Sequence, residues 1–178
     1  EAEAAFMVDD EYHGRGIATL LRACGMKVLG VNTSGGNTHA NFDDCLRLQD
    51  LRRRAEGIDC VINTLPLHEG TEGLLDEAFF SLFHRSLFIN VGRGRTVNTQ
   101  ALGRALDTEQ LRYCVLDVFS EEPLPIDSWL WQHPKVFISP HQAAVTDIDD
   151  VVPNFLTALD AYATQQNHEC FVSRTQAY

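Results

Sequence analysis

The stretch LFINVGRGRTVNTQALGRAL, residues 87–106, contains an apolar strand, a glycine-rich turn and a helix in that order. Residues 87–91 are apolar on both faces apart from one asparagine, which is typical of a strand buried inside a parallel sheet. After the turn GRGR, Asn98 or Thr99 can cap a helix that continues to Leu106. The stretch therefore predicts one strand–helix unit of an α/β sheet.

The same alternation of strand and helix extends in both directions along the chain. Strands are expected at residues 4–8, 26–31, 58–64, 113–118 and 136–138, and helices at residues 17–21, 45–56, 77–83 and 149–164. Asp76 can cap one of these helices, and Gly25 suits the end of another. Strands that are apolar on both faces and separated by helices indicate a parallel sheet covered on both sides. The predicted fold class is α/β, a doubly wound, mostly parallel Rossmann-type sheet with helices on both faces.

Charge and composition exclude several classes of partner. The 178 residues carry a formal net charge of −11, which argues against nucleic acid or an anionic membrane as the main partner. The only basic run is 52–54, which we interpret as a solvated helix end. No run approaches the ~20 apolar residues of a membrane span, and no secretory segment is recognisable.

The five cysteines form no CxxC pair, and they predict neither a metal site nor a disulfide framework. Cys24, Cys60 and Cys114 sit in or beside apolar runs, so we interpret them as buried free thiols. Free thiols are typical of a reducing compartment, and we expect a cytoplasmic protein.

Three side chains with complementary chemistry follow three of the predicted strands. Arg93, Glu122 and His141 all come after strand ends, and the carboxyl ends of parallel strands meet at the edge of the sheet where ligands bind. The guanidinium can grip a carboxylate in bidentate fashion. A carboxylate can orient an imidazole and favour its protonated form, so that it acts as an acid near neutral pH.

Each of the three residues also has a purely structural interpretation. An arginine between two glycines, such as Arg93, is often only a charged loop residue. Glu122 before Pro123 is compatible with a solvated turn, and His141 with a histidine at a strand end whose hydrogen bonds are satisfied locally. Their convergence on one sheet edge favours the catalytic hypothesis.

Five long motifs resemble the D-isomer-specific 2-hydroxyacid dehydrogenases, in particular the glyoxylate/hydroxypyruvate reductase and phosphoglycerate dehydrogenase-like branch. These motifs are LPLHEGTEGLL (65–75), FINVGRGRTVNTQALGRAL (88–106), LDVFSEEPLP (116–125), LWQHP (130–134) and SPHQAAVT (139–146). The resemblance implies hydride transfer between NAD(P)H and a small 2-oxo acid, with the cofactor carrying the redox chemistry. It also implies a homodimer.

The resemblance implies a role for each candidate residue. Arg93 would hold the substrate carboxylate and keto oxygen, His141 would be the acid/base at the C2 oxygen, and Glu122 would be the partner of that histidine. Asp117 would contact the nicotinamide amide. The backbone lining the cofactor would come from Leu65, Pro66, Val91 and Gly92.

The family's phosphate-binding turn is altered in this chain. Its G-x-G-x-x-G fingerprint falls on residues 9–14, where Asp9 and Glu11 replace the first two glycines and only Gly14 is kept. Two unit charges ~4 Å apart interact by roughly 4 kcal/mol at an effective dielectric of 20. A helix N-terminus offers an anion only about 0.3–2 kcal/mol. We therefore expect weak NAD(P) binding.

The position that usually reads the adenosine ribose is Asn32, where the family carries an acid. No Arg or Lys follows in residues 33–39 to accept a 2′-phosphate, so the choice between NAD and NADP stays open. The alternative interpretation is that Asn32 serves only a turn.

Residues 1–147 are expected to form the dinucleotide-binding domain, and 148–178 a C-terminal helix and tail that would pack on a substrate domain absent from this sequence. The cleft between two such domains would not form from this chain alone, so we expect no turnover by this chain on its own. One alternative is a non-catalytic dehydrogenase-like module for dimerisation or docking. A more remote one is an acyl-CoA-binding, acetyltransferase-like protein, since HGRGIA (13–18) also resembles the pyrophosphate loop of that class.

Overall fold

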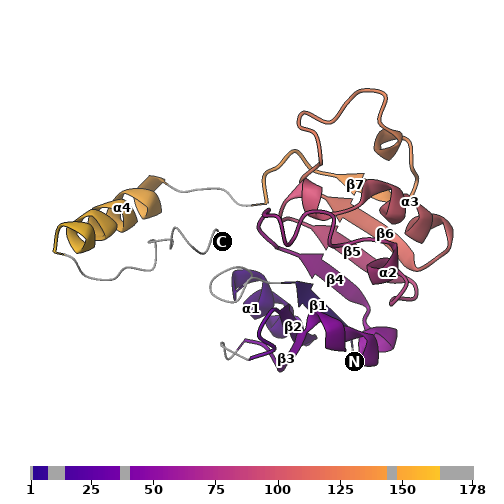
Figure 1. The fold of residues 1–178 in the computed structure, drawn as a ribbon, viewed down its shortest axis with the longest axis horizontal. Helices are drawn as coiled ribbons and strands as arrows, with labels where there is room; N and C mark the ends of the chain where they lie inside the picture. The colour runs from indigo at the N-terminus through magenta and orange to yellow at the C-terminus, as the bar shows by residue number, and fades with distance from the viewer. Residues whose placement is uncertain (1, 8–14, 37–40, 144–147, 165–178) are drawn as a thin grey trace. The chain divides into compact units, whose positions relative to one another are not determined.

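The computed structural model describes residues 2–7, 15–36, 41–143 and 148–164. Seven strands form one sheet in the order β3-β2-β1-β4-β5-β6-β7, and every neighbouring pair is parallel (Figure 1). The predicted doubly wound sheet is confirmed. The strands are β1 Glu3–Met7, β2 Lys27–Asn32, β3 Asp44–Arg47, β4 Cys60–Asn63, β5 Ser86–Asn90, β6 Leu111–Leu116 and β7 Val136–Ile138.

Four α-helices accompany these strands in the described part of the chain. They are α1 Arg15–Ala23, α2 Glu77–Phe80, α3 Thr99–Asp107 and α4 Ile148–Ala163. Asp76 caps α2 by accepting a hydrogen bond from the Phe79 amide, and Asn98 caps α3 by accepting one from the Ala101 amide. Both predicted caps are confirmed, with Asn98 rather than Thr99 as the cap of α3.

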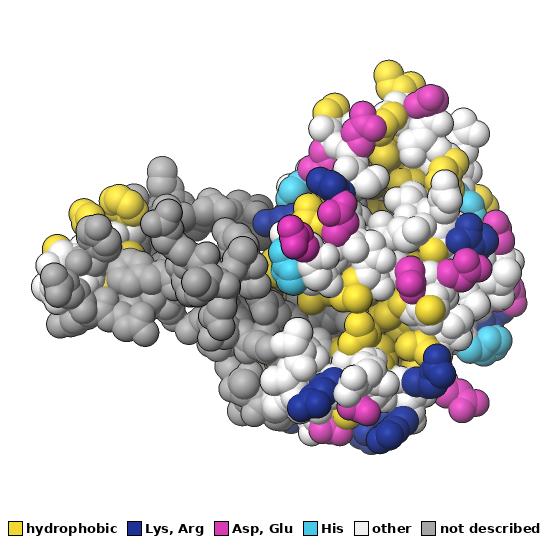
Figure 2. Space-filling model, viewed as in Figure 1, with side chains coloured by type: hydrophobic (Ala, Val, Ile, Leu, Met, Phe, Trp, Pro, Cys, Tyr) yellow, Lys and Arg dark blue, Asp and Glu magenta, His cyan; other side chains and the backbone are white. Residues whose placement is uncertain are grey.

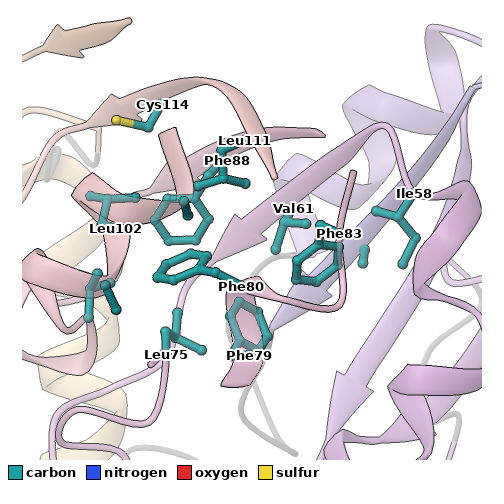
Figure 3. Packing of buried hydrophobic residues seen from close by; sticks show 14 of the residues in the cluster. Ile58, Val61, Leu75, Phe79, Phe80, Phe83, Phe88, Leu102, Leu111 and Cys114 are labelled. Atoms are coloured by element: carbon teal, nitrogen blue, oxygen red, sulfur yellow. The ribbon is translucent and has the colours of Figure 1, made fainter. Parts of the chain in front are cut away.

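The core has two layers because successive strand residues point to opposite faces of the sheet. On one face, Leu29 and Val61 pack with residues of α2 and α3, and on the other, Val28 and Ile62 pack with Ala18 of α1. The first layer is rich in aromatic rings (Figure 3). Phe80 is fully buried and meets the rings of Phe79 and Phe88 edge to face, at 5.4 and 5.3 Å between centroids.

The order of the strands reverses between β1 and β4. The first strand pairs with β2 on one side and with β4 on the other, so connections leave the sheet in opposite directions at this point. Such a reversal opens a crevice at the carboxyl ends of the strands, where ligands of doubly wound sheets bind. All candidate residues that follow β4, β5, β6 and β7 lie at this edge.

The helix predicted over residues 45–56 is wrong. Asp44–Arg47 form β3 on the edge of the sheet, and two short 3₁₀ helices, η1 Leu48–Arg53 and η2 Ala55–Gly57, follow. Pairing with β2 overrides the helical spacing of the leucines, because it buries Cys45 against Gly30. Leu51, from the same periodic set, is fully buried within η1.

The thiol prediction is correct for two of the three cysteines. Cys60 and Cys114 are buried free thiols, and burial raises the pKa of each to about 12. Cys24 is exposed, contrary to the prediction, because it follows the end of α1 and does not share the buried face of that helix. Cys45, which lay in the expected helix, is buried instead.

Charges of both signs are interspersed on the visible face of the molecule (Figure 2). The basic run 52–54 is exposed, as predicted, and Arg54 lies 2.8 Å from Glu3 and 3.5 Å from Asp44. Such exposed pairs contribute little stability each.

Internal contacts divide the chain into Glu1–His141 and Gln142–Tyr178. Within the second unit, α4 contains Pro153 and exposes Phe155, Leu156 and Leu159. None of the described helices is long and apolar enough to span a bilayer.

The aromatic layer yields a stability prediction. We expect Phe80→Ala to lower the free energy of unfolding by about 3–5 kcal/mol, because it leaves a cavity among packed rings. Phe137→Ala is the matched control, since that ring is 55% exposed and its removal should cost less than ~1 kcal/mol. Urea unfolding followed by circular dichroism measures both, with Phe80→Leu as the milder variant, and equal effects at the two positions would contradict the assignment of the core.

Candidate active site

Glu122 and His141 are in direct contact, as predicted. The Nδ1 atom of His141 lies 2.8 Å from Oε2 of Glu122, and the other carboxylate oxygen accepts a hydrogen bond from the Phe119 amide at 2.9 Å. These two hydrogen bonds, that from the Phe119 amide first, hold the pKa of Glu122 below its usual value. The carboxylate is therefore ionised at neutral pH and accepts the proton of Nδ1, which fixes the ring and leaves Nε2 for proton transfer.

The backbone at His141 has an unusual conformation. Its φ angle is 52°, in the left-handed region that residues other than glycine rarely adopt. Ser139, two residues earlier, donates a hydrogen bond from its hydroxyl to Asp117 at 2.5 Å, and its amide donates to the Leu116 carbonyl. The segment that carries His141 is thus attached to the carboxyl end of β6 on one side and to Glu122 on the other.

Arg93 lies at the same edge between two glycines, each of which touches a neighbouring loop. A Cβ atom at Gly92 would lie 2.7 Å from the Leu65 carbonyl oxygen, and one at Gly94 would overlap the Phe119 carbonyl group. Only glycine allows such close approach of two backbones. Because the Phe119 amide also binds Glu122, the loop of Arg93 packs directly on the loop that anchors the carboxylate.

The side chain of Arg93 is exposed, and its Nη1 donates a hydrogen bond to the Gly92 carbonyl at 2.8 Å. Arg93 therefore shares the edge with the Glu122–His141 pair and is held by its own loop. A guanidinium in this position can bind a planar anion through two parallel hydrogen bonds.

A buried polar network beneath these loops was missed by the sequence analysis. Asn63 donates hydrogen bonds from Nδ2 to Oδ1 of Asn90 and to Oγ1 of Thr96, both at 2.8 Å, and these three residues are at most 1% exposed. The Oδ1 atom of Asn63 accepts from the Leu65 amide, and that of Asn90 accepts from the Gly92 amide. The network fixes the backbone on both sides of the contact between the two loops. The sequence feature that could have predicted this network is the asparagine that ends each of two apolar strands, β4 and β5.

Four of the predicted cofactor residues follow β4 and β5 directly. Leu65 and Gly92 are buried and lie in the loops just described, while Pro66 and Val91 beside them are half-buried. Asp117 is 3% exposed, and its amide donates to the Asn90 carbonyl. Gly14, Asp9 and Glu11 lie outside the described residues.

Asn32 closes a turn. Its Oδ1 accepts a hydrogen bond from the Gly35 amide at 2.6 Å, and its Nδ2 donates to the Gly36 carbonyl at 3.1 Å. Asn32 is 7% exposed, and its contacts agree with the alternative interpretation from the sequence, in which this residue stabilises a turn. Among the described residues, no group of three or more His, Cys, Asp or Glu side chains could hold a metal ion.

The family described as D-isomer specific 2-hydroxyacid dehydrogenase, NAD binding domain, matches residues 13–143. The chain belongs to this family. Members similar to it include glyoxylate/hydroxypyruvate reductase A of Citrobacter koseri, which is 44% identical over 87 residues, 48% of this chain and 28% of that protein. The chain spans less than two thirds of the length of the curated relatives that it matches.

Solved structures of 2-hydroxyacid dehydrogenases share the fold. The enzyme of Xanthobacter autotrophicus in complex with NADPH and MES superposes with a TM-score of 0.90 at 26% identity, over 99% of this chain and 73% of the other. The NADPH-dependent glyoxylate/hydroxypyruvate reductase of Sinorhizobium meliloti, in complex with NADP and sulfate, superposes with a TM-score of 0.88 at 26% identity. That match covers 99% of this chain and 57% of the other.

Close packing at Gly94 leads to a first prediction for the site. Gly94→Ala should lower the free energy of unfolding by at least ~2 kcal/mol and displace the Phe119 amide resonance, because the added methyl overlaps backbone. Gly57→Ala is the matched control, since nothing lies within 4 Å of a Cβ atom there. Urea unfolding and amide NMR spectra measure both effects, and an undisturbed Phe119 amide in the Gly94 variant would argue against the packing described.

The carboxylate of Glu122 leads to a second prediction. Because its pKa is lowered in the folded protein, the stability it contributes is present above the ordinary glutamate value of ~4.3 and is lost as the pH falls through the folded-state value. The Phe119 amide proton should titrate with a midpoint below ~4.3. Glu122→Gln should abolish that titration in the NMR spectrum, and a midpoint above the ordinary value would contradict the hydrogen bonding at this carboxylate.

Proposed function

We propose that this chain is the dinucleotide-binding part of an oxidoreductase that transfers a hydride between NAD(P)H and a small 2-oxo acid of the glyoxylate or hydroxypyruvate type. The observation that carries the proposal is the Glu122–His141 pair, with 2.8 Å between carboxylate and imidazole, at the same sheet edge as Arg93. Names of relatives such as glyoxylate/hydroxypyruvate reductase support the reaction class.

Each of the three side chains has one task in the proposed reaction. Arg93 binds the carboxylate and the keto oxygen of the 2-oxo acid through its guanidinium, which fixes the substrate and polarises the carbonyl. His141 delivers a proton from Nε2 to the C2 oxygen, while Glu122 holds the ring and stabilises its charged form. The pair is anchored to the Phe119 backbone, so the imidazole is oriented before the substrate binds.

In this proposal the dinucleotide lies along the carboxyl edge of the sheet. Leu65, Pro66, Val91 and Gly92 would line it, and Asp117 would contact the nicotinamide amide. The nicotinamide ring supplies or accepts the hydride when the cofactor is bound. We expect NAD(P)H to bind weakly, because the negative charges of Asp9 and Glu11 oppose the pyrophosphate.

The proposal includes the organisation of the protein. We assign 1–147 to the dinucleotide-binding domain and 148–178 to a segment that packs on a substrate domain, and the match of the family to residues 13–143 supports the first assignment. The homodimer and the cytoplasmic location belong to the same proposal. Free thiols at Cys45, Cys60 and Cys114 support the location.

The acids at positions 9 and 11 favour a second candidate function, a non-catalytic dehydrogenase-like module that dimerises or docks a partner. In that case the Rossmann-type sheet and its edge are retained and the nucleotide is not bound. The intact contact between Glu122 and His141 favours the enzyme over this alternative.

Cofactor titration tests the proposal. We expect the native chain to bind NADH and NADPH weakly by fluorescence, and Asp9→Gly combined with Glu11→Gly to raise affinity by up to about a thousandfold, the equivalent of ~4 kcal/mol. Tight binding by the native chain would contradict the interpretation of the turn.

Activity separates the two candidate functions. Glyoxylate and hydroxypyruvate reduction should appear in a longer form that carries a substrate domain, and His141→Ala should abolish it while leaving nucleotide affinity unchanged. A longer form that binds NADPH and reduces neither substrate would favour the non-catalytic module.

A further inference from the structure

We propose that Arg47, at the end of β3, binds the 2′-phosphate of the adenosine ribose and selects NADP(H) over NAD(H). The inference rests on the proposed function, since it assigns one end of the same dinucleotide site. Arg47 lies in the segment 45–56, for which the sequence predicted a helix instead of the edge strand β3.

The sheet places Arg47 beside the residue that faces the ribose in this fold. In the register of β2 with β3, Asn32 pairs with Arg47, and both are the last residues of their strands. In doubly wound dinucleotide-binding folds, an acid near the end of the second strand binds the ribose 2′-hydroxyl, whereas a nearby arginine accommodates a 2′-phosphate. The cation comes here from the neighbouring strand rather than from the loop after β2.

The turn after β2 holds the arginine in place. Nε of Arg47 donates a hydrogen bond to the Ser34 carbonyl at 3.0 Å, and a Cβ atom at Gly35 would lie only 2.9 Å from Cγ of Arg47. Gly35 has a φ angle of +71°, so the turn both needs glycine for its conformation and uses it to admit the arginine stem. Asn32 closes this turn through the hydrogen bonds to Gly35 and Gly36.

The guanidinium is exposed and, within the described ranges, no carboxylate lies within ion-pair distance of it. Other arginines, such as Arg54, Arg85 and Arg104, do have such a partner. With Nε bound to Ser34, the two terminal nitrogens point their N–H groups away from the stem, in the geometry that grips phosphate oxygens.

The sequence that follows β2 carries no acid as far as residue 41. The segment from residue 31 to residue 41 reads VNTSGGNTHAN, without Asp or Glu. Asn32 takes the place of the acid that marks NAD-binding members of the fold, and its polar atoms are engaged in the turn. A 2′-phosphate therefore gains a charge-assisted contact with Arg47, and NAD(H) gains nothing equivalent.

The test avoids the acidic turn at residues 9–14 by using ligands without a pyrophosphate. Adenosine 2′-monophosphate and adenosine 5′-monophosphate are titrated into the native chain and followed by NMR at the Gly35 and Gly36 amides. We expect the 2′-isomer to bind about tenfold more tightly, and Arg47→Gln to remove that preference. Arg53→Gln is the matched control, because it removes the same charge from a side chain that is 84% exposed on η1, and it should keep the preference.

Equal binding of the two isomers, no binding of the 2′-isomer, or a preference that survives Arg47→Gln would each overturn the proposal. A second measurement compares NADPH with NADH in the Asp9→Gly, Glu11→Gly protein, where Arg47→Gln should weaken NADPH about tenfold and leave NADH unchanged. If that protein binds neither dinucleotide while the preference for adenosine 2′-monophosphate depends on Arg47, the dinucleotide function fails and the phosphate site stands.

Discussion

The backbone contacts of Gly92 and Gly94 set the positions of the candidate catalytic groups. Gly92 packs on the loop after β4 and Gly94 on the loop after β6, so the segment that follows β5 is fitted between its two neighbours. The second loop carries the Phe119 amide that anchors Glu122, and Glu122 in turn orients His141. A side chain at either glycine would separate these loops and move the arginine relative to the histidine.

The parallel sheet makes this arrangement stable, but at the cost of burying polar groups. Asn63 and Asn90 end two strands that are otherwise apolar, and an unpaired amide there would cost about 1–3 kcal/mol. The side chains of Asn63, Asn90 and Thr96 supply hydrogen-bond partners to one another. Among the described residues, no buried side-chain polar atom lacks a partner. The amide oxygens of the two asparagines also accept hydrogen bonds from the Leu65 and Gly92 amides, so the network both stabilises the sheet and fixes the loops.

The sequence predicted those features that depend on local pattern. Apolar strands, the caps Asp76 and Asn98, and the contact of Glu122 with His141 all follow from spacing, capping chemistry and family motifs. The edge strand β3 was missed because Cys45 is buried by pairing with β2, a long-range contact that outweighs the helical spacing of nearby leucines. The close approach of Gly94 to Phe119 could not be predicted from the sequence either, because it brings together residues 25 positions apart in the chain.

Arginine side chains lie at the carboxyl edge of the sheet, although the protein as a whole is strongly acidic. With a net charge of −11, the field of the whole chain opposes anionic ligands, but salt screens it beyond a Debye length of ~8 Å. Cations at the point of contact therefore decide whether an anion binds.

Arg93 follows β5 and Arg47 ends β3, on opposite sides of the point where the strand order reverses. An anionic substrate at one end and a phosphorylated ribose at the other would each meet an arginine held by a backbone carbonyl, Gly92 in one case and Ser34 in the other. The acids Asp9 and Glu11 stand in the sequence between β1 and α1, where the fold binds pyrophosphate, so the binding proposed at the two ends would be opposed by repulsion between them.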